Sequence, residues 1–124
     1  MRLRTFFTIA SVVALVYAVG LILLPGIMNT LYGFGGSASE KLISQLFGVT
    51  LLIIGLILWL GKNLNGVSAR PIIAGNLIGN VVGTLISLVG TLGGTMNSFG
   101  WSAVLIYFLL ALGFAYFQFM SPAR

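Results

Sequence analysis

Residues 71–123 read PIIAGNLIGNVVGTLISLVGTLGGTMNSFGWSAVLIYFLLALGFAYFQFMSPA and contain no charged side chain. A helix needs about 20 apolar residues to cross the hydrocarbon core of a bilayer, which is about 30 Å thick. This stretch is too long for one crossing, and it divides at the glycines and polar residues of 93–97, which are typical of a turn. It therefore predicts two membrane-spanning helices, at about 71–92 and about 99–120.

Two further uncharged runs precede this stretch, at about 6–24 and about 42–60. The first run ends at Pro25, which cannot donate a hydrogen bond to the carbonyl one turn back. None of the runs alternates apolar and polar residues as the strands of a membrane barrel do. The sequence therefore predicts an all-α fold with a single membrane domain over 1–124. This domain is expected to be a four-helix transmembrane bundle in which short connections make successive helices antiparallel neighbours.

The composition is that of a membrane protein. Hydrophobic residues make up 59% of the 124 residues and charged residues only 6%, whereas a typical soluble domain has about 25% charged residues. So few charges cannot keep a soluble surface hydrated, and the surroundings of this chain are therefore predicted to be mostly lipid. The net charge of +5 comes from cations spread along the chain, which form no basic patch. We expect membrane lipids, and no nucleic acid, as partners.

The cations also predict the orientation in the membrane. In a four-span arrangement one side receives most of the basic residues: Arg2, Arg4, Lys62, Arg70 and Arg124. The other side receives only Lys41, which lies next to Glu40. Because Lys and Arg concentrate in cytoplasmic loops, both termini are predicted to be cytoplasmic.

Small residues mark the helix faces that are predicted to pack against one another. Lipid supplies no hydrophobic force between helices, so association relies on close packing and polar contacts. In the third span Gly75, Gly79 and Gly83 recur at every fourth position and would let a neighbouring helix approach closely. We expect this packing within one chain, with self-association as the alternative. The packing faces of the first two spans carry similar small residues: Ala14, Ala18, Gly48 and Gly55.

Polar residues lie beside the glycines of the third span: Asn76, Asn80 and Thr84. One interpretation is structural, because an interhelical hydrogen bond stabilises a membrane bundle by about 0.6 kcal/mol on average. The other is functional, because polar groups inside a membrane often mark a site. Asn76, Asn80 and Thr84 are therefore candidate ligand- or pigment-binding residues.

Glu40 is the only acidic residue of the chain. Ser37-Ala38-Ser39-Glu40 matches a capping box, in which the side chains of Ser37 and Glu40 bond each other's backbone amides at the start of a helix. Proton coupling is the alternative role, since transporters use acids inside the membrane. Capping is favoured because Glu40 lies at the start of the second span rather than in its middle.

Most catalytic and metal-binding residue types are missing from the sequence. It has no Cys, no His and a single acidic residue. Cys or His metal sites and Ser–His–Asp triads are therefore excluded, and no pair of carboxylates is present for acid–base catalysis. We predict that the protein is not an enzyme and that it requires no metal or cofactor. A bound lipid, quinone or pigment is the alternative.

Several short stretches together resemble a known family. They are 23–26 (LLPG), 31–33 (LYG), 55–60 (GLILWL), 97–101 (NSFGW) and 112–116 (LGFAY). In these stretches the chain resembles the small bacterial four-helix membrane proteins of the DoxX type. The resemblance implies a multi-pass protein of the bacterial inner (cytoplasmic) membrane. It carries over no activity and no functional residue.

The missing catalytic residues predict a non-catalytic accessory or scaffold subunit of a larger bacterial membrane complex, for example a respiratory or photosynthetic one. Other membrane-protein subunits are then expected as partners, and the bulky half of the third span, which includes Leu85 and Leu92, is free to contact them. A small oligomeric transporter or channel is one alternative. A membrane protein that binds lipid, quinone or pigment is the other.

Overall fold

The structure is a computed structural model, and it describes residues 2–120. Within this range every regular element is a helix, and no strand is present. The elements in chain order are α1 (Leu3–Leu23), α2 (Pro25–Tyr32), α3 (Ala38–Leu60), α4 (Gly66–Leu92), α5 (Gly100–Ala115) and a π-helical turn, η1 (Tyr116–Met120), which continues α5. Arg124, one of the cations used above to predict the orientation, lies outside the described residues.

Four helical segments are long and apolar enough to cross a membrane, namely α1, α3, α4 and α5 together with η1. Their lengths are 21, 23, 27 and 21 residues, and about 20 residues suffice for one crossing. The predicted all-α fold with four candidate membrane spans is confirmed. The chain has the architecture of a multi-pass membrane protein.

The short helix α2 is an element that the sequence analysis misses. Pro25 is expected there only to end the first span, but the structure begins a new helix at this residue. Proline suits the first position of a helix because its missing N–H would have no partner there in any case. Gly33 ends α2 with a φ of 82°, and its N–H bonds back to the carbonyls of Asn29 and Thr30. The connection between the first two spans is therefore itself partly helical.

α4 begins at Gly66, ahead of the predicted start at Pro71. The side-chain oxygen of Asn65 accepts a hydrogen bond from the backbone N–H of Ser68 at 2.8 Å. Such a cap satisfies an amide that has no partner in the first turn of a helix. The helix consequently starts inside the connecting loop and continues through Pro71.

The capping box predicted at the start of α3 is present. The Ser37 hydroxyl oxygen accepts a hydrogen bond from the backbone N–H of Glu40 at 3.1 Å. In return, the backbone N–H of Ser37 donates to the Glu40 carboxylate at 3.3 Å. This reciprocal cap starts α3 at Ala38, ahead of the predicted start near residue 42.

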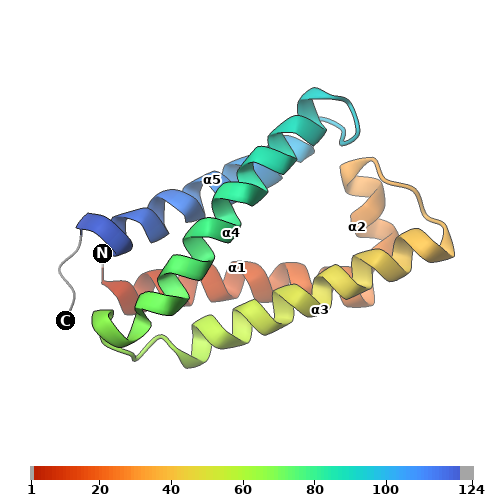
Figure 1. Cartoon of the computed structure of the whole chain (residues 1–124). Coiled ribbons are helices and arrows are strands. Elements are labelled where there is room, and N and C mark those ends of the chain that lie inside the picture. The colour runs from red at the N-terminus through yellow and green to blue at the C-terminus, as the bar shows by residue number, and fades with distance from the viewer. Residues whose placement is uncertain (1, 121–124) are drawn as a thin grey trace.

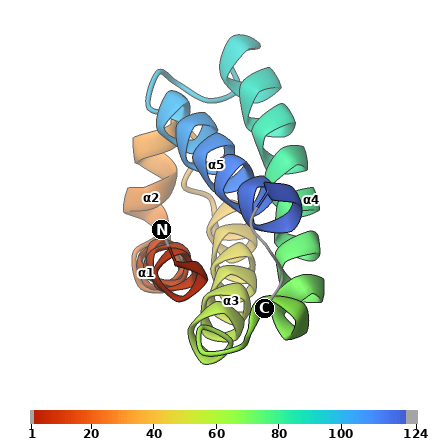
Figure 2. The ribbon, with the colours of Figure 1, turned by 90° about the vertical axis from the view of Figure 1, so that its left-hand side faces the viewer.

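The long helices form two pairs: α1 packs along α3, and α4 packs along α5 (Figures 1 and 2). Glycines bring the backbones of the first pair together. A Cβ at Gly48 would lie 3.1 Å from the carbonyl oxygen of Ala18, and a Cβ at Gly55 would lie 3.3 Å from that of Ser11. Gly48, Gly55 and Ala18 therefore lie in the contact between α1 and α3.

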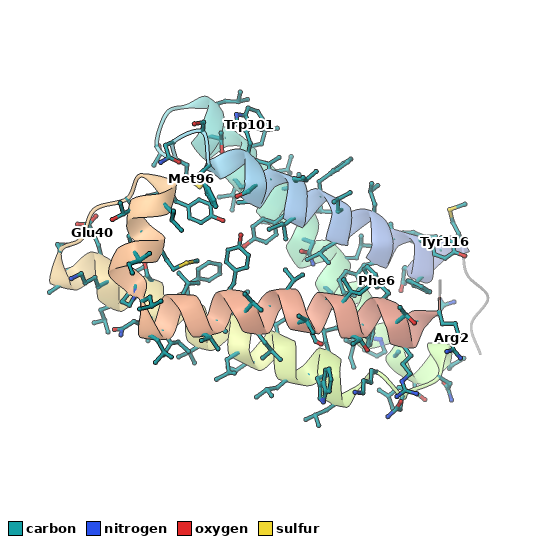
Figure 3. All side chains as sticks on the ribbon, turned by 180° about the vertical axis from the view of Figure 1, so that it is seen from behind. Arg2, Phe6, Glu40, Met96, Trp101 and Tyr116 are labelled. Carbon is teal, nitrogen blue, oxygen red and sulfur yellow. The ribbon has the colours of Figure 1, made fainter. Side chains whose placement is uncertain are left out.

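The two pairs meet at the end of the molecule where α1 starts and α5 finishes, here called the convergent end (Figure 1). The buried residues that fill this end form the aromatic cluster: Phe6, Phe7, Ala10, Leu58, Ala69, Ile73 and Phe114. The rings of Phe6 and Phe114 are edge to face, with their centroids 4.7 Å apart. Figure 3 shows Phe6 between the ribbons of α1 and α5, close to Arg2. These aromatic contacts join α1 to α5.

At the opposite, divergent end, α2 links the two pairs. It packs on α1 and α3. The ring of Tyr32 lies edge to face with that of Phe99, with a centroid distance of 4.9 Å. The backbone N–H of Asn97 donates to the carbonyl of Tyr32 at 3.0 Å. The first pair is thereby connected to the loop between α4 and α5.

Candidate functional site

A cavity of about 760 Å³, the central cavity, lies between the two helix pairs. All five α-helices contribute side chains to it, because the pairs meet at one end and separate toward the other (Figure 1). Pockets that hold drug-sized ligands measure about 300–1,000 Å³ and are mostly apolar, with a few polar groups. The central cavity has this size and this kind of lining.

The aromatic cluster closes one end of the central cavity and α2 closes the other. Phe114 and Leu58 of the aromatic cluster line it at the convergent end. Met28 and Tyr32 of α2 line it at the divergent end, together with Met96, which lies next to α2 in Figure 3. The remaining walls are the inward faces of the four long helices.

The exposure of the lining residues points to a sideways opening of the central cavity between α3 and α4. The residues of α1 and α5 that line it are all buried or half-buried. On α3 and α4, in contrast, lining side chains reach the outer surface: Phe47 is 45% exposed, Val82 is 47% exposed and Ile86 is 68% exposed. These residues belong to the candidate membrane spans. The opening therefore leads toward lipid.

Of the three α4 glycines that were predicted to pack, Gly75 and Gly79 line the central cavity and have open space beside them. Among the described residues, no atom comes within 4 Å of the place where a Cβ would stand at Gly75 or Gly79. Contrary to the prediction, neither glycine packs against another helix of the described residues, and both line the central cavity instead. Gly83 does have a neighbour, since a Cβ there would lie 2.5 Å from Cδ1 of Tyr107 on α5.

Asn76, Asn80 and Thr84 bond within α4 instead of across to another helix. The side-chain amide of Asn76 donates to the carbonyl of Ile72 at 3.0 Å, and that of Asn80 donates to the carbonyl of Asn76 at 2.7 Å. The Thr84 hydroxyl donates to the carbonyl of Asn80 at 2.8 Å. The predicted interhelical hydrogen bond is thus not formed by these side chains. Asn76 and Asn80 line the central cavity, as does Ala14, whereas Thr84 does not.

Three tyrosines that were not among the predicted site residues line the central cavity: Tyr17, Tyr32 and Tyr107. The hydroxyls of Tyr17 and Tyr32 are 2.9 Å apart. The Tyr32 hydroxyl is also 3.4 Å from that of Ser102, which donates to the carbonyl of Phe99 at 2.6 Å. Tyrosine normally concentrates at the membrane interface. Tyr17 lies deep within an apolar run, and this unusual position could have identified it as a site residue from the sequence.

Asn29 holds α2 in place at the divergent end. This residue is only 2% exposed. Its amide nitrogen donates to the carbonyl of Gly35 at 3.0 Å, and its amide oxygen accepts from the Ser44 hydroxyl of α3 at 2.5 Å. Both hydrogen-bonding groups of this buried side chain are satisfied, so Asn29 has a structural role in the wall of the central cavity.

Within residues 2–120 no charged side chain lines the central cavity. Lys62 lies over the ring of Trp59, with its ammonium nitrogen 3.3 Å from the ring centroid. Glu40 lies near the start of α3, at the divergent end, and Arg2 lies at the opposite end of the molecule (Figure 3). A charged ligand in the central cavity would have no oppositely charged partner, and burying an unpaired charge is strongly unfavourable. The site therefore suits an uncharged ligand.

Comparisons with models of known protein families, with curated proteins and with solved structures found no match to this chain. Residues 2–120 hold no group of three or more His, Cys, Asp or Glu side chains that could bind a metal ion. The chemistry of the site follows from the central cavity itself. It offers an apolar volume, amide and phenol groups, and an opening on the side of the bundle.

Proposed function

We propose that this protein binds a lipid-soluble small molecule that enters the central cavity from the surrounding bilayer. The observation that carries the proposal is the sideways opening between α3 and α4, within the apolar spans. A molecule dissolved in the membrane reaches such an opening by diffusion in the plane of the bilayer, without crossing water. The aromatic cluster fills the convergent end, which favours a binding cavity over a channel.

Any ligand of the central cavity has to compete with lipid tails. Because lipid is as apolar as the cavity wall, apolar contact alone does not favour a ligand over a lipid tail. Selectivity then depends on the shape of the cavity and on its polar groups. The amides of Asn76 and Asn80 and the hydroxyl of Tyr107 are the groups available for this role.

The membrane arrangement is part of the same proposal: successive spans antiparallel, both termini cytoplasmic, in a bacterial inner membrane. Support comes from the start of α1 and the end of α5, which lie at the same end of the molecule (Figure 1). Arg2 lies at this end, and Lys62 and Arg70 flank the start of α4, whereas Glu40 lies at the other end (Figure 3). Basic residues concentrate on the cytoplasmic side. The resemblance to DoxX-type proteins supports the choice of membrane.

The test is to identify what leaves the membrane with the protein. The full chain is extracted in a mild detergent and analysed by native mass spectrometry, followed by extraction with organic solvent. We expect one lipid-soluble species in stoichiometric amount. In the Gly79→Phe variant this species should be lost, because the new ring would extend into the opening from a position where no atom of the described residues lies within 4 Å of its Cβ.

Val89→Phe is the matched control, since Val89 is 71% exposed on α4 and does not line the central cavity. It adds a ring to the same helix without entering the opening, so it should keep the bound species. The proposal fails if the wild-type protein and the Gly79→Phe variant carry the same mixture of bulk membrane lipids.

The accessory or scaffold role predicted from the sequence stays a prediction. The exposed side of α4, which includes Ile78, Leu85 and Val89, suits a partner subunit as well as it suits lipid. A partner subunit that co-purifies in a fixed ratio would support this role, and a chain that migrates alone in native gels would contradict it. The transporter alternative is tested separately, by flux of candidate substrates into liposomes.

A further inference from the structure

Asn80 and Tyr17, two of the polar residues that line the central cavity, lie well inside the candidate membrane spans. α4 has 27 residues and is about 40 Å long, at about 1.5 Å per residue. Asn80 is about 21 Å from its first residue, Gly66, and therefore lies near the middle of the helix. Tyr17 lies at a similar distance, about 21 Å, from the start of α1. A polar group of a ligand held here would lie far from both membrane surfaces.

Asn76, Asn80 and Tyr107 have hydrogen-bonding capacity that the protein does not use. Each amide donates one N–H to a carbonyl of α4, which leaves its second N–H and its oxygen without a partner in residues 2–120. The Tyr107 hydroxyl makes no hydrogen bond within the same range, whereas Tyr17 and Tyr32 bond to each other. Polar groups in apolar surroundings are unfavourable unless they are paired. These three side chains therefore favour a ligand with a polar group.

Tyr107 and Asn80 share one region of the wall, and Asn76 lies about one helical turn from Asn80 on α4. The ring of Tyr107 packs on Gly83, which lies close to Asn80 on the same helix, and Tyr107 and Asn80 both line the central cavity. Gly79 adjoins Asn80 and has open space where a side chain would otherwise stand. This space beside Asn80 is available to a small polar group of a ligand.

The charge of the lining restricts the ligand further. Because no charged side chain lines the central cavity among the described residues, a phosphate or ammonium group at this depth would be buried without a partner. The amide N–H groups and the phenol O–H can donate to a carbonyl, and the amide oxygens can accept from a hydroxyl. The chemistry fits a neutral carbonyl or alcohol group and rejects a phospholipid head group.

We infer that the ligand is an uncharged, largely hydrocarbon molecule that carries a carbonyl or hydroxyl group, and that Asn76, Asn80 and Tyr107 bind this group in the middle of the membrane. The inference rests on the proposed function and adds the chemical class of the ligand and its contacts. The hydrocarbon part occupies the apolar remainder of the cavity, toward the aromatic cluster or toward the opening.

Four probes with the same alkyl chain test the inference: hexadecyl methyl ketone, hexadecanol, hexadecane and hexadecyl phosphate. Each is added to the full chain in detergent after the co-purified lipid has been removed, and binding is measured by native mass spectrometry. We expect the ketone, the alcohol or both to bind about tenfold more tightly than hexadecane, the effect of one well-formed hydrogen bond. Hexadecyl phosphate should bind no better than hexadecane. The ketone and alcohol results distinguish a carbonyl from a hydroxyl ligand.

Variants connect the preference to the named residues. Tyr107→Phe and Asn80→Ala should each weaken binding of the preferred probe about threefold to tenfold and leave hexadecane binding unchanged. Tyr116→Phe and Asn63→Ala are the matched controls, because both residues are exposed and lie outside the central cavity. The infrared carbonyl stretch of the bound ketone gives a second readout in the wild-type protein, where a hydrogen bond should lower its frequency.

The experiment distinguishes a failure of the inference from a failure of the proposed function. If hexadecane binds as tightly as the ketone and the alcohol, the inference about the polar group is wrong, but the central cavity remains a binding site for apolar molecules. If hexadecyl phosphate binds best, the inferred neutrality is wrong. If no probe binds and no species co-purifies, both the inference and the proposed function fall.

Discussion

The hydroxyl of Tyr17 on α1 lies 2.9 Å from the hydroxyl of Tyr32 on α2. The same Tyr32 oxygen is 3.4 Å from the hydroxyl of Ser102 on α5. Tyr32 therefore connects three helices at the divergent end of the bundle. Together with Asn29, this phenol group holds α2 where it lines the central cavity.

Replacing Tyr32 by Phe removes the hydroxyl and keeps the ring. We expect the free energy of unfolding to fall by about 1 kcal/mol, since hydrogen bonds in membrane proteins contribute about 0.6 kcal/mol on average and about 1.7 kcal/mol at most. Hydrogen exchange of the α2 amides, measured by mass spectrometry in detergent, should become faster. Tyr116→Phe is the control at a tyrosine that is 44% exposed. Wild-type exchange rates in α2 of Tyr32→Phe would contradict the proposed role.

Alanine should have opposite effects at two glycines. At Gly48 a Cβ would lie 2.9 Å from the Cβ of Leu21 and 3.1 Å from the carbonyl oxygen of Ala18, so α1 and α3 would have to separate. At Gly79 no atom of the described residues obstructs a Cβ, and alanine removes the conformational freedom of glycine in the unfolded chain. Gly48→Ala should lower the free energy of unfolding by about 2 kcal/mol. Gly79→Ala should raise it by about 0.5 kcal/mol. Denaturant titration in detergent micelles measures both, and shifts of the same sign would refute the prediction.

The aromatic cluster should be the most sensitive part of the fold to truncation. Phe114 is fully buried and contacts the rings of Phe6 and Phe7. Phe114→Ala should lower the free energy of unfolding by about 3 kcal/mol, because it leaves a cavity where the two helix pairs meet. Phe119, which is 75% exposed, provides the control variant Phe119→Ala, for which we expect little change. Equal effects of the two substitutions would show that the cluster does not hold the pairs together.

The orientation is directly testable because the sequence has no cysteine. Single cysteines at Gly36 and Asn63 would lie in exposed connections before and after α3. With cytoplasmic termini, a membrane-impermeant maleimide should label Gly36→Cys in spheroplasts and Asn63→Cys only after lysis. The reverse labelling pattern would show that the charge distribution had been misinterpreted.

The four spans were predictable because each depends on a local property, a long uncharged run. The first residues of the helices were less predictable, because side-chain caps start two of them earlier in the sequence than the uncharged runs begin. Asn65 caps α4 ahead of Pro71, and Ser37 caps α3, which begins at Ala38. α2 was missed because a proline after an apolar run can either end one helix or occupy the first position of the next. Only the packing of the following residues distinguishes these two uses.

The central cavity could not be predicted from the sequence. Glycines at every fourth position look the same whether another helix packs on them, as α5 does at Gly83, or nothing does, as at Gly75 and Gly79. The spacing between helices is decided by distant residues, here the aromatic cluster and α2. Asn76 and Asn80, which were predicted as candidate binding residues, do line the central cavity. Their hydrogen bonds could not be predicted, because these depend on which groups lie opposite them in the fold.

The aromatic cluster joins the helix pairs at one end and α2 links them at the other, and this has a mechanical consequence. Each pair is a stiff arm about 30 Å long, so a rotation of about 5° at the rings of Phe6 and Phe114 displaces the far tip by about 3 Å. That displacement is close to the thickness of an alkyl chain. A larger rotation would have to break the contacts of Tyr32 with Phe99 and Ser102 at the far end, so α2 limits how far the gap between α3 and α4 can widen.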